Sequence, residues 1–277
     1  MTVVDSHLHV WVLRPEKYPW QNLLSSLPEE EASAELLLKY MDENGVDKAV
    51  LVQPSFYGYD NSYAADCLER YSDRLAGVCM VDPLDEKAPS QLEHWVKDQG
   101  FQGLRLHPHR QHDPTWLNDK KAFPLWEKAA ELGIPICFLI LPHQMGRLED
   151  MVKRFPTVKV VIDHLGRPVV EKPPYPSFKG ILKIGEYPNA YIKVSGHYGF
   201  TKEPYPYADT HVFVKIAYEV YGPRRMLWGT DFPWILKHCG YTKALGLVRD
   251  NGFGFLTQED KEWILGKTSL SLWRFGC

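Results

Sequence analysis

The sequence predicts an α/β protein, a (β/α)8 barrel of the TIM type that residues 1–277 form as a single domain. The first observation is an alternation of short β-branched or apolar runs with amphipathic helical patterns, in units of roughly 30 residues that match the size of such a barrel. The second is that few of these runs alternate apolar with polar residues, which is typical of parallel strands buried on both faces. A chain of 277 residues can form one large domain of this kind.

Eight strands are expected, at residues 3–7, 48–53, 77–81, 103–107, 134–139, 159–163, 191–195 and 226–230. Amphipathic helices are expected between and after them, at residues 31–44, 61–71, 90–99, 119–132, 145–155, 178–186, 207–221, 241–251 and 258–265. Three of these helices end at a glycine, Gly45, Gly100 or Gly133, which is followed by an apolar residue that opens the next strand. A helix-closing glycine before a strand indicates an αβ loop.

The main rival to the barrel is an open, doubly wound sheet. That fold would be favoured by a glycine-rich phosphate-binding loop after the first strand. Residues 7–11 read HLHVW and contain no glycine, so the barrel is preferred.

Composition restricts the classes of function. With 24% charged residues, a formal net charge of −3 and no basic block, the chain gives no argument for binding nucleic acid. The longest apolar run, residues 134–142, is too short to cross a bilayer, and residues 1–20 lack the pattern of a secretory signal. The five cysteines are an odd number without a C-x-x-C pair, which suits reduced thiols. We therefore expect a cytoplasmic protein that acts on a small molecule; a homo-oligomer is left open.

Polar residues that close the strands are the candidates for a functional site, because the carboxyl ends of all barrel strands meet at one mouth. His7 and His9 close the first strand and, being two residues apart, point to the same face. Two imidazoles on one face can share a metal ion, although such a pair is also common as two polar residues at a strand mouth. The other strand closures offer Arg105 and His107, His164, Ser195 and Asp231.

Several motifs at these closures resemble a known family. His-x-His at 7–9, His164 and Gly-Thr-Asp-Phe-Pro at 229–233 are similar to the amidohydrolase superfamily, specifically its amidohydrolase-2 branch, over nearly the whole chain. Further motifs resemble the lactonases of that branch, which hydrolyse 2-pyrone-4,6-dicarboxylate, sulfomuconolactone or sugar lactones. These motifs are VQPS at 52–55, GYDN at 58–61, GLR at 103–105, DHLGRP at 163–168 and KVSG at 193–196.

The resemblance implies one divalent metal ion, zinc or alternatively manganese, held by His7, His9 and Asp231. Neutral imidazoles and a carboxylate with an open position let such an ion act as a Lewis acid and lower the pKa of a bound water. The fifth strand is wholly apolar at residues 136–140, where a metal-binding histidine is common in the superfamily. The nearest further ligand is His143, in the following loop.

Two variations of this site are considered. A second metal ion is not expected, because the fourth strand carries Arg105 and His107 where binuclear relatives carry a carboxylated lysine or a glutamate. A metal-free site is the alternative to one ion, and in it His7, His9 and His164 would polarise the carbonyl directly.

The expected reaction is ring opening by water. Asp231 takes a proton from water as general base, and the oxygen attacks the ester carbonyl of a lactone. The metal or His164 stabilises the tetrahedral oxyanion, and the proton on Asp231 passes to the leaving alkoxide.

Two arginines have the chemistry to bind an anionic substrate. The guanidinium groups of Arg105 and Arg110 can meet a carboxylate or sulfonate through two hydrogen bonds. Alternatively, Arg105 pairs with an internal acid such as Asp82 or Asp163, and Arg110 is a solvated surface charge. Further candidate substrate contacts, against ordinary loop capping, are Ser55, Tyr57, His107 and Ser195.

The function predicted is therefore that of a metal-dependent hydrolase that opens a small lactone bearing a carboxylate or sulfonate. A metal-dependent decarboxylase of the same branch, acting on a carboxylated aromatic, is the first alternative. A barrel that only binds a ligand is the non-enzyme alternative, and the presence of Asp231 and His164 argues against it.

Overall fold

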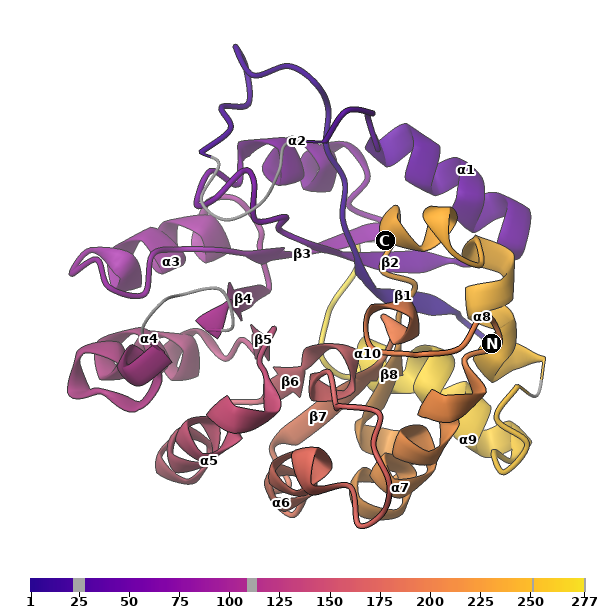
Figure 1. Cartoon of the computed structure of the whole chain (residues 1–277). Helices are drawn as coiled ribbons and strands as arrows, with labels where there is room; N and C mark the ends of the chain where they lie inside the picture. Colours follow the sequence, from indigo (N-terminus) through magenta and orange to yellow (C-terminus); the bar gives the residue numbers. More distant parts are fainter. Residues whose placement is uncertain (22–27, 109–113, 251, 277) are drawn as a thin grey trace.

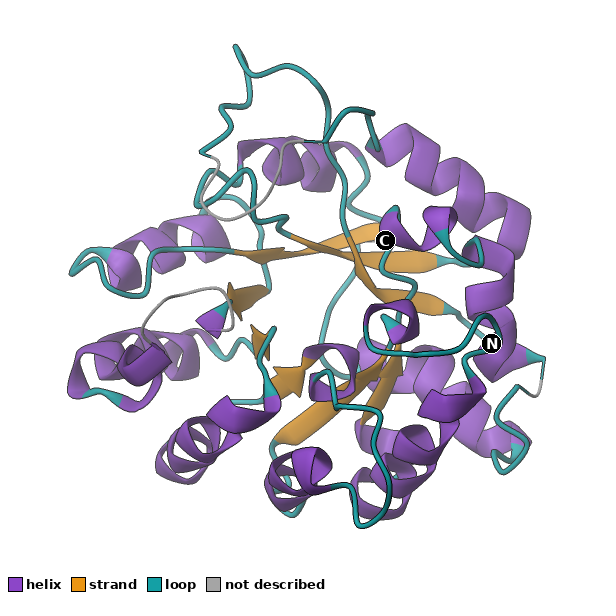
Figure 2. Cartoon of the chain, in the orientation of Figure 1, coloured by secondary structure: helices purple, strands orange, loops and turns teal. Residues whose placement is uncertain are grey.

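The structure of the chain is a computed structural model that describes residues 1–21, 28–108, 114–250 and 252–276. Within these residues, eight parallel strands follow one another around a barrel in chain order, and the helices surround it (Figures 1 and 2). The strands are β1 (Val4–Leu8), β2 (Lys48–Val52), β3 (Leu75–Cys79), β4 (Gly103–Leu106), β5 (Ile136–Phe138), β6 (Val160–Ile162), β7 (Ala190–Val194) and β8 (Met226–Trp228). The predicted (β/α)8 barrel is confirmed.

The helices match the predicted positions. They are α1 (Ala34–Asn44), α2 (Ser62–Arg70), α3 (Ala88–Lys97), α4 (Phe123–Leu132), α5 (Met145–Arg154), α6 (Lys179–Gly185), α7 (His211–Tyr221), α8 (Tyr241–Arg249), α9 (Gln258–Glu262) and α10 (Thr268–Leu270). Several of them, such as α1, α4 and α7, start later than predicted, and α3 starts two residues earlier. Helix α1 begins after Ser33, whose side chain accepts a hydrogen bond from the N–H of Leu36. It ends at Gly45 with φ of 67°, and α4 ends at Gly133 with φ of 66°, so these two glycine stops are confirmed.

Two predicted helices are divided near their first turns. Before α4 lies a short 3-10 helix, η3 (Lys120–Ala122), and Pro124 stands in the first turn of α4, where its missing N–H costs no intrahelical bond. Before α7 lies η8 (Ala208–Thr210), preceded by Tyr207 with φ of 60°. That left-handed backbone cannot continue a right-handed helix, which explains the later start of α7.

The barrel closes between β1 and β8 through backbone hydrogen bonds between the end of β1 and the segment that follows β8. The N–H of His9 donates to the carbonyl of Phe232 at 2.7 Å, and the N–H of Asp231 donates to the carbonyl of His7 at 2.8 Å. Gly229 lies against β1 here, and a Cβ at this glycine would come within 2.8 Å of the Cβ of His7. The seam therefore brings the segment after β8 directly against the end of β1.

The apolar core has two parts. The larger part lies between the strands and the surrounding helices, and the smaller part includes Val4, Val50, Cys137 and Trp273. Strands β4 and β7 contribute charged residues at the level of this smaller cluster. Arg105 is the strand neighbour of Cys137 across β4 and β5, and Lys193 is the strand neighbour of Leu227 across β7 and β8. The barrel interior is therefore charged as well as apolar. Of the described helices, none is long and apolar enough to span a membrane.

Buried His197 makes the stability of the fold depend on pH. Its Nδ1 lies 2.9 Å from the hydroxyl of Thr210, which itself donates to the carbonyl of Tyr207 at 2.7 Å, so Nδ1 carries the proton. Burial, and then the charges of neighbouring histidines, lower the pKa of His197 from 6.5 to about 3. Because the unfolded state takes up this proton first, stability is lost as the pH falls from 6.5 towards 3.

We predict that His197→Asn flattens this pH dependence, because the amide keeps the donor to Thr210 without titrating. Between pH 7 and pH 5 the variant should lose about 2 kcal/mol less unfolding free energy than the wild type. Urea unfolding at the two pH values measures this difference. The same substitution at exposed His143 is the control, and an equal pH dependence in His197→Asn and the wild type would contradict the prediction.

Candidate active site

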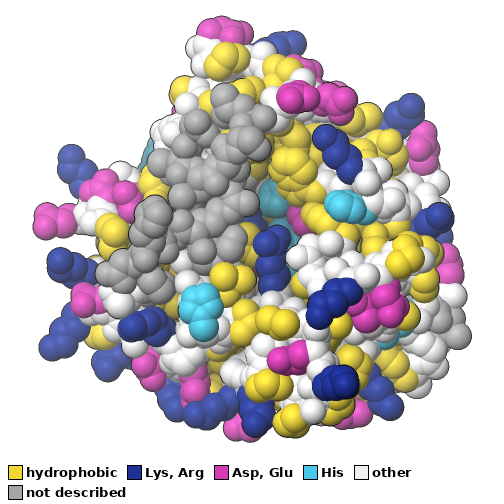
Figure 3. Space-filling model, viewed as in Figure 1, with side chains coloured by type: hydrophobic (Ala, Val, Ile, Leu, Met, Phe, Trp, Pro, Cys, Tyr) yellow, Lys and Arg dark blue, Asp and Glu magenta, His cyan; other side chains and the backbone are white. Residues whose placement is uncertain are grey.

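A cavity of about 310 Å³ opens at the carboxyl ends of the strands, and this volume suits a small ligand. It is lined by His9, Pro54, Ser55, Phe56, Arg105, His107, Leu139, His164, Arg167, Tyr198, Asp231, Trp234, Lys237 and His238. Figure 3 shows histidine, acidic and basic side chains gathered at a hollow near the middle of the visible face. As predicted, polar residues from the ends of several strands lie together at one end of the barrel.

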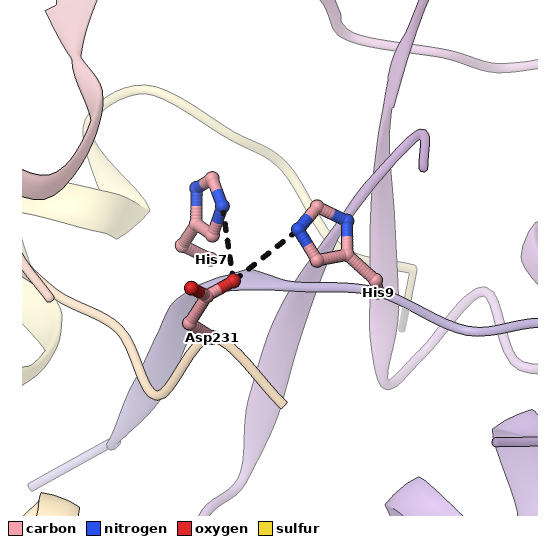
Figure 4. A group of neighbouring side chains, drawn as sticks. All are labelled: His7, His9 and Asp231. Carbon is pink, nitrogen blue, oxygen red and sulfur yellow. Dashed lines mark ion pairs between the residues drawn. The ribbon is translucent and has the colours of Figure 1, made fainter. Parts of the chain in front are cut away.

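His7, His9 and Asp231 form a buried cluster whose potential ligand atoms all lie within 4.8 Å of one another. One oxygen of Asp231, Oδ1, lies 3.3 Å from Nε2 of His9 and 3.7 Å from Nε2 of His7. In Figure 4 this oxygen faces both rings, whereas the other carboxylate oxygen points away from them. Two imidazoles and one carboxylate are a common ligand set for a divalent ion that keeps an open position.

The hydrogen bonds of the two histidines provide a test of whether these residues fit a metal ion. Nδ1 of His9 lies 2.7 Å from the carbonyl of Val52, which can only accept, so Nδ1 carries the proton and Nε2 of the neutral ring presents a lone pair. This lone pair faces the carboxylate of Asp231, and Nε2 of His7 is buried without a hydrogen-bond partner. The lone pair of His9 and the carboxylate of Asp231 thus face one another, an arrangement that fits a cation between them.

A network of charges inside the barrel supports His7 from behind. Asp163 Oδ1 lies 3.2 Å from Nδ1 of His7 and 3.0 Å from Nζ of Lys193, and its Oδ2 lies 3.4 Å from Nε of Arg105. Burial alone would raise the pKa of the Asp163 carboxyl, but Lys193, His7 and Arg105 hold it well below its usual range. Asp163 is therefore an anion that can orient the His7 ring.

His164 reaches the site from an unusual backbone conformation. It follows β6 with φ of 54°, in the left-handed region, and its Nδ1 lies 2.9 Å from the hydroxyl of Ser195. A Cβ at Gly196 would overlap the ring of His164, so the glycine after Ser195 makes room for it. Burial is the main cause that lowers the pKa of His164 to about 4, so its ring is neutral at pH 7.

Asp231 is the point where these groups meet. Its Oδ2 accepts a hydrogen bond from the hydroxyl of Tyr198 at 2.6 Å and lies 3.7 Å from Nε2 of His164. Burial alone would raise the pKa of the Asp231 carboxyl, but the imidazoles of His164, His9 and His7 hold it well below its ordinary value. The carboxylate is therefore ionised at neutral pH and can accept a proton.

The structure brings three of the six predicted substrate contacts to the cavity. Ser55, Arg105 and His107 line the cavity, although Arg105 also lies beside Asp163, as its alternative interpretation proposed. Ser195 contacts His164 and is not among the lining residues. The position of Arg110 lies outside the described residues.

Two further predicted residues do not reach the cavity. The hydroxyl of Tyr57 donates to the carbonyl of Val12 and accepts from its N–H, at 3.0 and 3.1 Å, which commits this side chain to holding the loop after β1. His143 lies exposed in a 3-10 helix, η4 (Pro142–Gln144), and is not a member of the cluster of His7, His9 and Asp231.

Three basic side chains that line the cavity, Arg167, Lys237 and His238, were not among the predicted site residues. Arg167 is three residues after His164 in the strand-six motif, and that position was the one available signal. Lys237 and His238 lie in and after η10 (Trp234–Lys237), where nothing in the sequence distinguishes them from solvated surface residues. Buried Lys193 was also unassigned, although it lies two residues before Ser195 on the same strand face.

A parallel barrel with histidines at the end of β1 and β6 and an aspartate after β8 defines a TIM-barrel enzyme whose chemistry lies at the strand carboxyl ends. The chain belongs to the amidohydrolase family, because the amidohydrolase-2 family model matches residues 4–275. The predicted hydrolase of this superfamily is thereby confirmed.

Curated relatives of the chain include lactonases. An L-fucono-1,5-lactonase of Burkholderia ambifaria is 24% identical, over 83% of this chain and 80% of the relative. A 4-sulfomuconolactone hydrolase of Rhizobium radiobacter is 28% identical, over 86% of this chain and 76% of the relative.

Solved structures share the fold along the whole chain. A probable 2-pyrone-4,6-dicarboxylic acid hydrolase of Acinetobacter baumannii with citric acid bound superposes with a TM-score of 0.84 at 24% identity, covering 98% of this chain and 99% of that chain. A zinc-bound amidohydrolase of Burkholderia multivorans gives a TM-score of 0.83 at 17% identity, with both chains fully covered. A manganese-bound dihydroxybenzoic acid decarboxylase of Polaromonas gives 0.69 at 16% identity, covering 98% of this chain and 96% of that chain.

Proposed function

We propose that the protein is a hydrolase that opens a small lactone bearing a carboxylate or sulfonate. The observation that carries this proposal is the cavity in which ionised Asp231 lies beside neutral His164 and two basic residues, Arg167 and Lys237. Among the described residues, neither of these cations forms an ion pair with a carboxylate, and Nε of Arg167 is buried without a hydrogen-bond partner. The lactonases among the curated relatives support the same reaction class.

We further propose that His7, His9 and Asp231 hold one divalent ion, zinc or manganese. When bound there, the ion would supply Lewis acidity towards a water or a carbonyl oxygen. The bound metals named for two solved amidohydrolase-fold neighbours are consistent with this site. His143 is exposed and receives no role in this proposal.

The protein's own residues provide the proton transfers. Asp231 takes a proton from water as the water oxygen forms a bond to the lactone carbonyl carbon, and the carbonyl electrons move to its oxygen. When the hydroxyl of Ser195 donates to Nδ1 of His164, the ring proton lies on Nε2, which can donate to that oxyanion. The ring C–O bond then breaks, and the proton on Asp231 passes to the leaving alkoxide.

The basic residues of the cavity bind the substrate's anionic group. The guanidinium of Arg167 can form two hydrogen bonds to a carboxylate or sulfonate, and Lys237 adds a second positive charge. Arg105, His107 and Ser55 remain proposed contacts at the same cavity wall.

A decarboxylase acting on a carboxylated aromatic is the second candidate, and the fold shared with the Polaromonas decarboxylase favours it. Both reactions need an anionic substrate and a polar site. They differ in product, because decarboxylation releases CO2 whereas lactone hydrolysis generates acid, and a pH-stat combined with CO2 detection separates them.

We predict that Asp231→Asn lowers lactone hydrolysis by about 10²- to 10⁴-fold, the usual contribution of a general base. Acid release from a panel of sugar lactones, muconolactones and pyrone carboxylates measures the rate. Asp98→Asn, which removes a surface carboxylate paired with His94, is the matched control and should retain wild-type activity. Hydrolysis that persists unchanged in Asp231→Asn would instead favour a barrel that only binds its ligand.

Removal of the Arg167 charge should weaken binding of anionic lactones selectively. In Arg167→Met, we expect the KM for a carboxylated lactone to rise about tenfold or more, the size of one lost charged hydrogen bond, with little change for an uncharged lactone. Initial rates over a range of both substrates give the two values. Arg224→Met changes an exposed arginine and is the control, and an equal loss for charged and uncharged lactones would oppose this role.

The metal proposal predicts that the wild type binds about one equivalent of Zn²⁺ or Mn²⁺ and that His9→Ala binds it at least tenfold more weakly. Equilibrium dialysis followed by elemental analysis gives both values, and exposed His94→Ala is the control. Hydrolysis should stop on treatment with a chelator and return when Zn²⁺ or Mn²⁺ is added. Hydrolysis that continues in the presence of the chelator would contradict the metal proposal but not the proposed role of Asp231 as the base.

A further inference from the structure

Tyr198 makes a contact with Asp231 that neither the family motifs nor the predicted site residues included. It lies in η7 (His197–Gly199), the short 3-10 helix after β7, and lines the cavity. Its hydroxyl donates to Oδ2 of Asp231 at 2.6 Å, within the range of a strong hydrogen bond to a charged acceptor. We propose that Tyr198 is a positioning residue that fixes which oxygen of Asp231 faces His7 and His9, an inference that rests on the proposed role of Asp231.

The carboxylate of Asp231 needs such a restraint. Rotation about the bond between Cβ and Cγ of an aspartate is soft and roughly two-fold, so its backbone does not decide which oxygen faces which partner. Oδ1 lies close to Nε2 of both His7 and His9, whereas Oδ2 lies on the side of Tyr198 and His164. A hydrogen bond held by Oδ2 therefore keeps Oδ1 directed at the two histidines, the orientation of Oδ1 that Figure 4 shows.

Tyr198 is itself held in place by its ring. The ring of His238 stacks on it, with centroids 4.0 Å apart and planes inclined by 17°. Because Tyr198 follows β7 and His238 follows η10, the stack joins the loops after β7 and β8 across the carboxylate that both loops adjoin. The stack thus fixes the position of the Tyr198 hydroxyl, so this side chain acts as a hydrogen-bond donor in addition to lining the cavity.

This arrangement divides the work of one carboxylate between its two oxygens. Oδ1 is the oxygen that the two histidines share, and it is the one available to a cation. Oδ2 keeps one lone pair for Tyr198 and a second for a proton from water, on the side of His164. Loss of the phenol hydroxyl would let the carboxylate rotate, which would weaken a cation site and misplace the base while leaving the substrate contacts unchanged.

The test is Tyr198→Phe, which keeps the ring and its stack on His238 but removes the hydroxyl. The matched control is Tyr218→Phe, because Tyr218 also donates to an aspartate, Asp260, at 3.1 Å and lies away from the cavity. Affinity for Zn²⁺ and Mn²⁺ is measured by competition with a chromophoric chelator, and kcat and KM are measured on the lactone that the wild type hydrolyses best.

In Tyr198→Phe we expect metal affinity to fall about tenfold or more, the usual effect of losing a group that orients a ligand, and kcat to fall with KM nearly unchanged. Tyr218→Phe should match the wild type in both. Wild-type metal affinity and kcat in Tyr198→Phe would overturn the positioning role, as would an equal loss in the control.

The metal measurement separates this inference from the proposed function. A wild type that hydrolyses no lactone, combined with weaker metal binding in Tyr198→Phe, would overturn the lactonase proposal and support the positioning role. If the wild type hydrolyses lactone without metal, the fall in kcat alone decides for or against Tyr198. A wild type that neither hydrolyses a lactone nor binds metal would overturn the lactonase proposal and the positioning role together, because Asp231 would then have no function that Tyr198 could support.

Discussion

The site depends on the closure of the barrel between β1 and β8. Asp231 is more than 220 positions from His7 and His9 in the chain, and only the seam of backbone hydrogen bonds from Asp231 to His7 and from His9 to Phe232 brings them together. The same seam requires Gly229, since a side chain there would meet His7. Correct closure of the last strand on the first is therefore also the step that assembles the carboxylate with its two imidazoles.

A second constraint is the buried carboxylate of Asp163. It holds two cations, Lys193 and Arg105, inside the barrel, and both its Oδ1 and Nζ of Lys193 lie close to Nδ1 of His7. Removing one partner from such a buried pair leaves an uncompensated charge at a cost of about 3–5 kcal/mol, so these residues stabilise one another as a group. The charge behind the site thus serves the packing of the barrel and the orientation of a candidate metal ligand at once.

Much of the fold could be predicted because strand and helix periodicity, with glycines such as Gly45 and Gly133, are local signals. The site was predictable as far as barrel geometry alone places residues, which covers His7, His9, His164 and Asp231. The remaining assignments depend on where long side chains and loops point. Tyr57 turns to the backbone of Val12, and Lys237 reaches the cavity from η10, and no periodicity in the sequence records either direction.

The charge of the cavity follows from which groups burial leaves ionised. Burial keeps the rings of His7 and His164 neutral at pH 7, so they add no positive charge. Among the described residues that line the cavity, Asp231 is the acidic one. The cavity also contains the positive charges of Arg167 and Lys237, and Arg105 lies beside Asp163, whose single negative charge is shared with Lys193. The balance is an excess of positive charge, which a divalent ion at His7 and His9 would increase further. A neutral lactone would leave that excess uncompensated in a partly desolvated cavity, whereas an anionic one would neutralise it, and this difference supports the proposed preference for substrates that carry their own carboxylate or sulfonate.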